Sequence, residues 1–182
     1  MVTSEPKGPP RGRRQRSHDA FAAFASGAAP RLVRSAQLVL GDRGSAEDAA
    51  QTALLRVFRR WDAIDSSPSG YAAAALVNVC RDMLRSRARS RETATDPASL
   101  ELGGVAASFD VGERLAVQAA LAGLPQLQRE VVALRYLLDL SVSDTAVALG
   151  VPQGTVKSAT SRAFDRLRLV LSPDYEEAHH AH

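Results

Sequence analysis

The segment SVSDTAVALGVPQGTVKSATSRAFDRLRLVL constrains the fold of this chain more than any other. Ser141 can cap a short helix, and Gly150 permits the positive φ of a tight turn after that helix. A second helix is expected near Pro152, because the missing N–H of a proline costs nothing in a first helical turn. Small Ala146 would let the two helices approach closely, and apolar Val156 would hold the second against the first. This spacing predicts a helix-turn-helix.

The predicted second helix has an apolar line and a polar face. The residues expected in the core are Val156, Thr160, Ala163, Leu167 and Val170. The opposite face is small and polar, with Gly154, Ser158, Ser161 and Asp165, flanked by Thr155, Lys157 and Arg162. Such a face suits the major groove of DNA, where side chains contact bases and phosphates, although the carboxylate of Asp165 fits this use poorly. An ordinary amphipathic helix with solvated charges is the simpler alternative, and the joint match of turn, core line and basic face favours DNA binding.

Helical periodicity also covers the rest of the folded chain, and no segment shows convincing strand alternation. Aromatic residues make up only 5% of the 182 residues, so the cores must be packed mainly with Leu, Val and Ala. We therefore predict an all-α fold of two small helical domains. The helices expected before the linker span residues 19–28, 31–40, 45–61 and 71–89, and the third of them would begin with a capping box of Ser45 and Asp48.

Composition shifts along the chain divide it into five parts. The first residues are rich in Pro, Gly and Arg and lack the apolar residues that would offset chain ordering, so we expect a disordered tail. This tail could be a solubilising arm or a nucleic-acid arm. Residues 92–113 contain five acidic residues and no basic one, which indicates an acidic linker. The predicted parts are a basic tail (1–16), a first domain (17–91), a linker (92–112), a second domain (113–171) and a tail (172–182).

The net charge of +3 hides a basic helix in the first domain. On the helix expected over residues 71–89, Leu76, Cys80 and Met83 share one side, and the other side carries Asn78, Arg81, Asp82, Arg85 and Arg89. A solvated face usually mixes charge signs, whereas here four basic residues from Arg85 to Arg91 follow Asp82 without an intervening acid. The face is therefore interpreted as a surface that follows DNA phosphates, with the amide of Asn78 able to read a base edge. The chain has only two lysines, and genomic base composition explains its excess of arginine as well as function does.

Several classes of protein are disfavoured by what the sequence contains. Cys80 is the only cysteine, so an intramolecular disulfide is impossible, and a small core residue is its simplest role. We expect an intracellular, cytoplasmic protein without membrane insertion, since the apolar runs are too short to cross a bilayer. No nucleophile–base pair, metal cluster or phosphate-binding glycine loop is evident, so we expect neither an enzyme nor a cofactor or metal.

Three blocks of the chain, taken in order, resemble a known family. AEDAAQTALLRVFRRWDAI, YAAAALVNVCRDMLRSRARSR and LPQLQREVVALRYLLDLSVSDTAVALGVPQGTVKSATSRAFDRLR are similar to conserved regions 2 and 4 of extracytoplasmic-function (ECF, group 4) sigma factors of the sigma-70 family. The actinobacterial SigE-like branch resembles the chain most. Helix-turn-helix regulators of the LuxR type share part of the last block but not the first two.

The resemblance implies a subunit that binds core RNA polymerase and directs promoter-specific initiation, while the polymerase performs the chemistry. Region 2 would bind the core enzyme through Glu47, Asp48, Gln51 and Leu55, although helix-dipole stabilisation alone also explains the acidic start and basic end of that helix. It would bind the −10 element through Asn78, Arg81, Asp82 and Arg85. Region 4 would bind the −35 element through Thr155, Lys157, Ser158, Ser161, Arg162 and Arg166.

The resemblance also implies partners and leaves a rival interpretation open. The expected partners are core RNA polymerase, promoter DNA and, by family habit, an anti-sigma factor, and the free protein is expected to be a monomer. The acidic linker would run through the polymerase towards the RNA exit path, although a linker without that role explains its composition as well. The rival is a stand-alone dimeric helix-turn-helix transcriptional regulator, which would protect a palindromic DNA site without polymerase.

Overall fold

The computed structural model describes residues 11–64, 67–93 and 111–171, together with the side chains of most of them. Within these ranges the chain forms helices and no strand. In chain order they are α1 (Arg11–Leu40), α2 (Arg43–Arg60), the short 3-10 helix η1 (Trp61–Ala63), α3 (Pro68–Thr93), α4 (Val111–Ala122), α5 (Gln126–Val132), the π-helix η2 (Ala133–Leu137), α6 (Val142–Leu149) and α7 (Gln153–Leu171). The all-α prediction is confirmed. Most of the predicted linker, the last tail and residues 1–10 lie outside the described residues.

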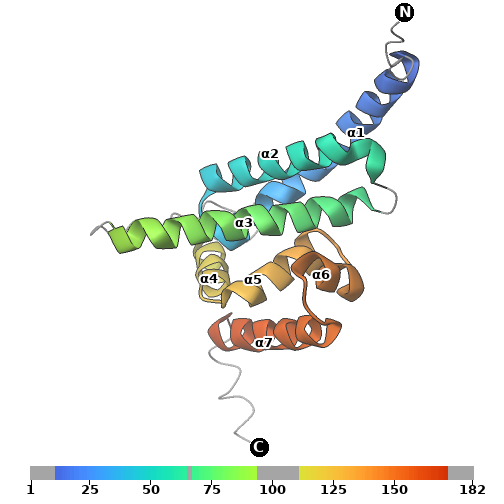
Figure 1. Cartoon of the computed structure of the whole chain (residues 1–182). Coiled ribbons are helices and arrows are strands. Elements are labelled where there is room, and N and C mark those ends of the chain that lie inside the picture. The colour runs from blue at the N-terminus through green and yellow to red at the C-terminus, as the bar shows by residue number, and fades with distance from the viewer. Residues whose placement is uncertain (1–10, 65–66, 94–110, 172–182) are drawn as a thin grey trace, which may run out of the picture.

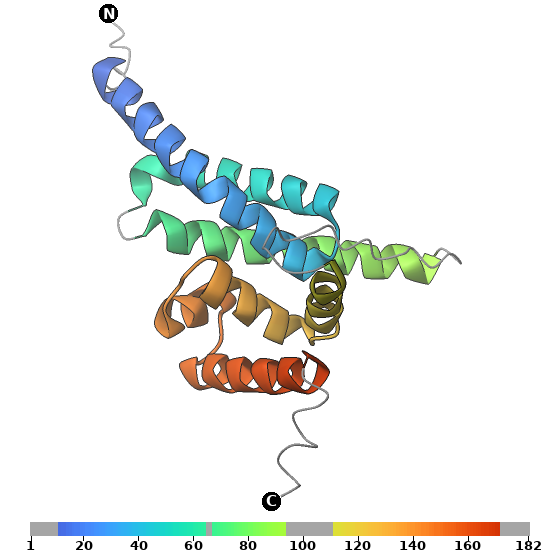
Figure 2. The same cartoon turned by 180° about the vertical axis from the view of Figure 1, so that it is seen from behind.

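The helices form two layers that share α3. Figure 1 shows α1, α2 and α3 packed as one bundle, with α4, α5 and α6 beneath α3 and α7 at the far side. Figure 2, from behind, shows α1 crossing this bundle diagonally. The first domain therefore comprises α1–α3 and the second α4–α7, and the two are in direct contact.

Helix α1 is longer than the sequence indicates. Two helices are predicted, at 19–28 and 31–40, but one continuous helix runs through Pro30. Pro30 lies on the exposed face, where water can bond the carbonyl that a proline leaves without its helical partner. Phe24 before it and Leu32 after it pack against the same core, which keeps the two halves in line. The helix also begins at Arg11, directly after Pro10 and six residues before the predicted start of the first domain at residue 17.

The corner between α1 and α2 is fixed by side chains from three places in the sequence. Asp42, not the predicted Ser45, caps α2, and its side chain accepts a hydrogen bond from the backbone N–H of Ser45 at 2.7 Å. Arg87 of α3 donates to Asp42, to the hydroxyl of Ser45 and, at 3.0 Å, to the carbonyl of Leu40 at the end of α1. Burial alone raises the pKa of Asp42, but the hydrogen bonds from Ser45 and Arg87 outweigh it and hold that pKa below its usual value.

The first core is built mainly from small residues. Ala46, Ala49, Ala50 and Ala53 line the inner face of α2 and are fully or almost fully buried, so α2 lies close to α1 and α3. Cys80 is 1% exposed in the same core, and burial raises the pKa of its thiol to about 12. The prediction that Cys80 is a core residue is confirmed.

The second core continues across the boundary between the domains. Ala73 and Val77 of α3 are buried in one cluster with Val131, Leu134 and Leu149 of the second domain. Residues of the second domain likewise enter the first core: Ala133 is buried in it, and Leu138 packs against it. The π-helix η2 closes with a hydrogen bond from the N–H of Leu138 to the carbonyl of Ala133 at 3.1 Å. The sequence predicts two domains but not the shared core between them.

Substitution of Arg87 tests the corner. Arg87→Met keeps the apolar stem and removes all three contacts, so we expect unfolding by urea to show a loss of roughly 1–2 kcal/mol at neutral pH, a modest value because solvent screens a pair exposed by about a third. Because the pKa of Asp42 is lowered in the folded state, its stabilising effect is present above its ordinary pKa of 3.8 and is lost as pH falls through the lowered value. The difference between variant and wild type should therefore shrink below about pH 4. Arg34→Met, at an exposed position of α1, is the control, and equal losses in both variants would contradict the assignment.

Candidate nucleic-acid interface

The turn between α6 and α7 has the geometry that the sequence predicts. The hydroxyl of Ser141 accepts a hydrogen bond from the N–H of Asp144 at 3.0 Å and so caps α6. Gly150 ends the helix with φ of 67°, and the N–H of Val151 donates to the carbonyl of Ala146 at 3.0 Å, as in a Schellman motif. The carbonyl of Pro152 then accepts the N–H of Thr155 at 2.9 Å, and α7 begins at the next residue after the proline.

The inner face of α7 follows the predicted line for most of its length. Val156 is fully buried in one cluster with Ala146, as expected for the residue that holds the helices together. Ala163 and Leu167 are also buried, against α4 and α5. Two expected core positions differ: Thr160 is half-buried with its hydroxyl bonded to the carbonyl of Val156 at 2.8 Å, and Val170 is 58% exposed. The buried part of the predicted apolar line ends at Leu167, because the cluster that α7 forms with α4 and α5 does not extend further. Ala159, rather than Thr160, is buried in the cluster with Val156.

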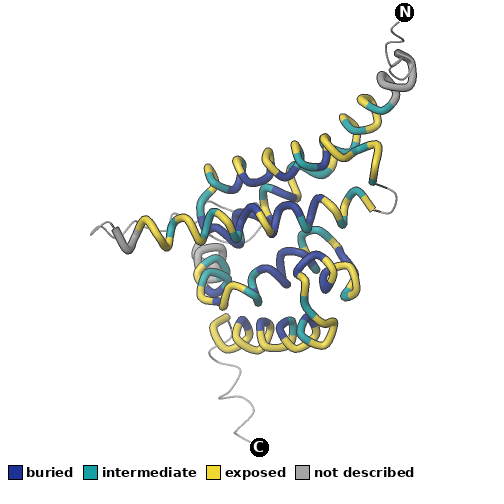
Figure 3. The backbone as a smooth tube through the Cα atoms, in the orientation of Figure 1, coloured by how far each residue is buried: buried dark blue, intermediate teal, exposed yellow. Residues whose placement is uncertain are grey.

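The outer face of α7 is open to solvent along the helix (Figure 3). The structure places all six predicted −35 contacts on this helix: Thr155 is half-buried, and Lys157, Ser158, Ser161, Arg162 and Arg166 are exposed. Asp165 does not interrupt the face as an isolated charge, because it accepts a hydrogen bond from Ser161 at 3.5 Å and pairs with Arg168 at 3.4 Å. The arrangement is a polar, basic ridge of the width of one helix, which is the shape that enters a DNA groove.

The predicted −10 residues of α3 are not all equally available. Asn78, Asp82 and Arg85 are exposed, and Arg85 pairs with Asp82 at 2.5 Å. Arg81 instead turns towards the second domain. Its Nη2 lies 2.7 Å from Oε2 of Glu130, and its Nε lies 3.0 Å from Oε1 of the same carboxylate.

Glu130 is a site residue that sequence reasoning missed. It lies three residues after Leu127 and four before Leu134, so it falls on the apolar side of its helix. An acid in such a position requires a buried partner, and this signal was available in the sequence. The sequence alone does not show which arginine pairs with Glu130.

Helix α2, which carries the predicted polymerase-binding residues, lies across α3 from the second domain (Figure 1). Glu47 is half-buried and forms an ion pair with Arg43 at 2.8 Å, while Asp48 and Gln51 are exposed. Leu55 is 56% exposed, and Phe58, one turn further along, was not predicted and is 39% exposed. Two exposed apolar side chains beside acidic groups form a surface suited to another protein.

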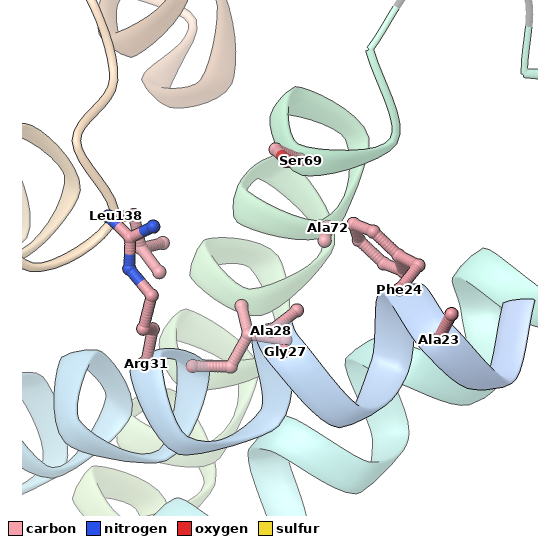
Figure 4. A pocket seen from close by; sticks show the side chains of 9 residues that line it. Ala23, Phe24, Gly27, Ala28, Arg31, Ser69, Ala72 and Leu138 are labelled. Carbon is pink, nitrogen blue, oxygen red and sulfur yellow. The ribbon is translucent and has the colours of Figure 1, made fainter.

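A cavity of about 350 Å³ lies where α1, the start of α3 and Leu138 meet (Figure 4). Phe24, Leu32 and Ala72 line it with apolar atoms, and Arg31 stands at its edge. The Nε of Arg31 donates to the carbonyl of Leu137 at 2.9 Å, so the arginine links the two domains across the cavity.

Two further findings concern the described ranges only. None of their helices is long and apolar enough to cross a membrane. Across residues 11–64, 67–93 and 111–171, no group of three or more His, Cys, Asp and Glu side chains is placed to hold a metal ion. The histidines near the end of the chain lie outside these residues.

Taken together, the exposed ridge of the helix-turn-helix and the basic helix of the first domain define a two-domain helical DNA-binding protein. A family model described as Sigma-70 region 2 matches residues 24–90, and one described as Sigma-70, region 4 matches residues 114–167. The chain is 36% identical over 140 residues to an RNA polymerase sigma-E factor of Streptomyces avermitilis, covering 75% of this chain and 76% of that one. It is 36% identical over 142 residues to the ECF RNA polymerase sigma factor SigM of Mycobacterium tuberculosis, covering 77% and 71%.

Solved structures agree with this assignment. The sigma factor RpoE of Bartonella quintana, solved with the anti-sigma factor NepR, has a TM-score of 0.76 and 25% identity, covering 85% of this chain and 98% of that one. CnrH, solved with the cytosolic domain of CnrY, shares the fold with a TM-score of 0.61 and 20% identity, covering 86% of this chain and 90% of that one. The chain belongs to the sigma-70 family, and within it to the ECF sigma factors.

Two glycines of the helix-turn-helix provide a matched test of the turn. A Cβ added at Gly150 or at Gly154 meets no atom within 4 Å, but only Gly150 has a positive φ. Gly150→Ala should therefore lower the free energy of unfolding by about 1 kcal/mol through backbone strain alone. Gly154→Ala should leave it unchanged or raise it by up to about 1 kcal/mol, because alanine is the better helix former. Urea unfolding of both variants measures the contrast, and equal effects would contradict it.

Proposed function

We propose that this sigma factor binds core RNA polymerase through the outer face of α2 and contacts promoter DNA through α3 and α7. The main observation that supports this proposal is that α2, α3 and α7 each carry exposed polar residues on the side away from the buried cores. Glu47, Asp48, Gln51 and Leu55 would bind the polymerase. Asn78, Arg81, Asp82 and Arg85 would bind the −10 element, and Thr155, Lys157, Ser158, Ser161, Arg162 and Arg166 the −35 element.

The physical roles of these faces differ. Lys157, Arg162 and Arg166 supply positive charge that attracts phosphates and orients the helix on the duplex. Ser158 and Ser161 are short donors and acceptors that can approach base edges in the major groove. On α3, the exposed amide of Asn78 can bond an unpaired base, while the neighbouring arginines hold the strand by its phosphates. Duplex contact at one element and capture of unpaired bases at the other would together assist promoter opening.

Three further parts of the proposal follow from membership of the family. The functional domains are residues 17–91 and 113–171, joined by an acidic linker at 92–112 between a basic tail (1–16) and a second tail (172–182). The protein is not itself an enzyme, since the polymerase performs catalysis, and it works in the cytoplasm where the polymerase and its template are. The similar sigma factor RpoE was solved with the anti-sigma factor NepR, and CnrH was solved with the cytosolic domain of CnrY. We therefore also propose an anti-sigma partner for this chain.

Reconstituted transcription tests the proposal as a whole. Purified protein added to sigma-free core polymerase should start RNA synthesis on members of a promoter library. A protein that never supports initiation, but protects a palindromic DNA site alone and as a dimer, would establish the rival regulator. The matches to region 2 do not favour that rival, because a stand-alone regulator has no use for a polymerase-binding domain.

The recognition helix can be tested separately from polymerase binding. Lys157→Ala and Arg162→Ala each remove an exposed charge of α7, so the use of the −35 element should fall by the equivalent of about 1–3 kcal/mol, while affinity for core polymerase stays unchanged. Run-off transcription and a polymerase-binding assay measure the two effects. Arg34→Ala removes the same charge from an exposed position of α1 and serves as the control. Reduced polymerase affinity in both α7 variants would count against their assigned role.

The polymerase-binding face depends on an exposed apolar side chain. Leu55→Ala should weaken binding to core polymerase by roughly tenfold, since the side chain is 56% exposed in the free protein and would be buried in the complex. The free energy of unfolding should barely change, for the same reason. Val147→Ala, which truncates an 80% exposed side chain on α6, is the matched control and should bind normally. Equal loss in both variants would contradict the assignment, as would normal binding by Leu55→Ala.

A further inference from the structure

Arg81 belongs to two surfaces at once. On α3 it stands one turn after Asn78 and next to Asp82, within the proposed −10 surface. In the structure its guanidinium forms a bidentate ion pair with Glu130 of the second domain, with Nη2–Oε2 at 2.7 Å and Nε–Oε1 at 3.0 Å. Its remaining nitrogen, Nη1, donates to the carbonyl of Leu149 at 3.3 Å. All three nitrogens of the guanidinium are therefore directed at the second domain.

The other half of the ion pair is almost completely enclosed. The side chain of Glu130 is 1% exposed, whereas that of Arg81 is 30% exposed. Gln126 also donates to Oε1 of Glu130, at 2.9 Å, but an amide brings no positive charge. Arg81 is the cation that is hydrogen-bonded to Glu130, and removal of one partner from such a buried pair is strongly destabilising, so the ion pair favours contact between the two domains. The hydrogen bonds to Glu130 raise the pKa of Arg81, which keeps its charge fixed.

The contact also ties α3 directly to the helix-turn-helix. Leu149 is the last residue of α6, immediately before the turn at Gly150. Ala73 and Val77 lie eight and four residues before Arg81 and are buried against the second domain, so the ion pair continues an apolar row along the same side of α3. Separation of the two domains would expose this row and release the guanidinium together.

We propose that the Arg81–Glu130 pair is an intramolecular latch, in which Glu130 occupies the cation that promoter DNA would otherwise bind. The inference rests on the proposed −10 role of Arg81. A DNA phosphate and the Glu130 carboxylate need the same two donors, so contact of Arg81 with DNA and closure of the domains exclude each other. The outer face of α7 stays exposed in the closed protein, and the latch therefore acts on the −10 surface alone.

Hydrogen exchange of the full chain tests the closure itself. Glu130→Gln removes the buried charge while keeping the side-chain shape, and Ala73→Gln places a longer neutral side chain in the buried apolar row. Both should speed amide exchange at least about threefold in 73–81 and 126–149, with no change in 46–57, the segment of α2 that packs on α1 and α3. Asp139→Asn is the matched control, because it removes an exposed acid of the second domain at a backbone position, φ of 56°, that asparagine tolerates.

DNA binding tests the competition. Fluorescence anisotropy with a labelled single-stranded DNA of mixed sequence should show about threefold or tighter binding by Glu130→Gln and Ala73→Gln, and no change for Asp139→Asn. Equal gains in Glu130→Gln and Asp139→Asn would overturn the latch, because a general charge effect would explain both. Faster exchange without tighter DNA binding would also overturn it, as would faster exchange in α2, which would show unfolding. Failure of the proposed function appears separately, as no transcription by the wild-type protein.

Discussion

Helix α3 is the element on which the rest of the structure depends, because it is buried on two adjacent sides by two different domains. One row of side chains, at Ala72, Leu76 and Cys80, packs with α1 and α2. The neighbouring row, at Ala73 and Val77, packs with the second domain and ends at Arg81. Only the remaining side of the helix is left for solvent, and it carries Asn78, Asp82 and Arg85. A four-residue repeat of small and medium apolar residues thus decides how much of α3 remains exposed for the proposed contact with DNA.

This arrangement sets the availability of the three functional faces. Helices α2 and α7 lie at opposite sides of the molecule (Figure 1), and both carry exposed polar residues, so the proposed polymerase-binding and −35 faces are accessible in the structure as it stands. The −10 face is different, because one of its four residues is bonded to the other domain. On the proposed −10 role, the use of Arg81 requires the domains to separate, and the burial of the shared apolar core opposes this separation. In the compact form, the proposed faces on α2 and α7 are exposed, and the proposed face on α3 is partly occupied by the contact between Arg81 and Glu130.

Local patterns predicted the helix-turn-helix well because its determinants are close in sequence. The cap at Ser141, the glycine turn and the burial of Val156 depend on residues within one or two helical turns of each other. Predictions failed where distant segments compete with local preference. Pro30 does not end its helix, since a shared core holds both halves, and Asp42 replaces Ser45 as the cap, since Arg87 binds them both. Val170 is exposed because the buried cluster on which α7 packs does not extend beyond Leu167.

The sequence by itself determined the class of fold, the positions of the binding motifs and the family, because helical periodicity, caps and turn glycines act over a few residues. The tertiary structure alone decided which charges meet. Arg81 and Glu130 are 49 residues apart, and Arg87 and Asp42 are 45 apart. Nothing in the local pattern distinguishes these two arginines from Arg85, which remains exposed on the same helix. Their roles differ because tertiary packing places an acid from a distant segment beside each of them, and the position of a helix against its neighbours is a property of the whole chain.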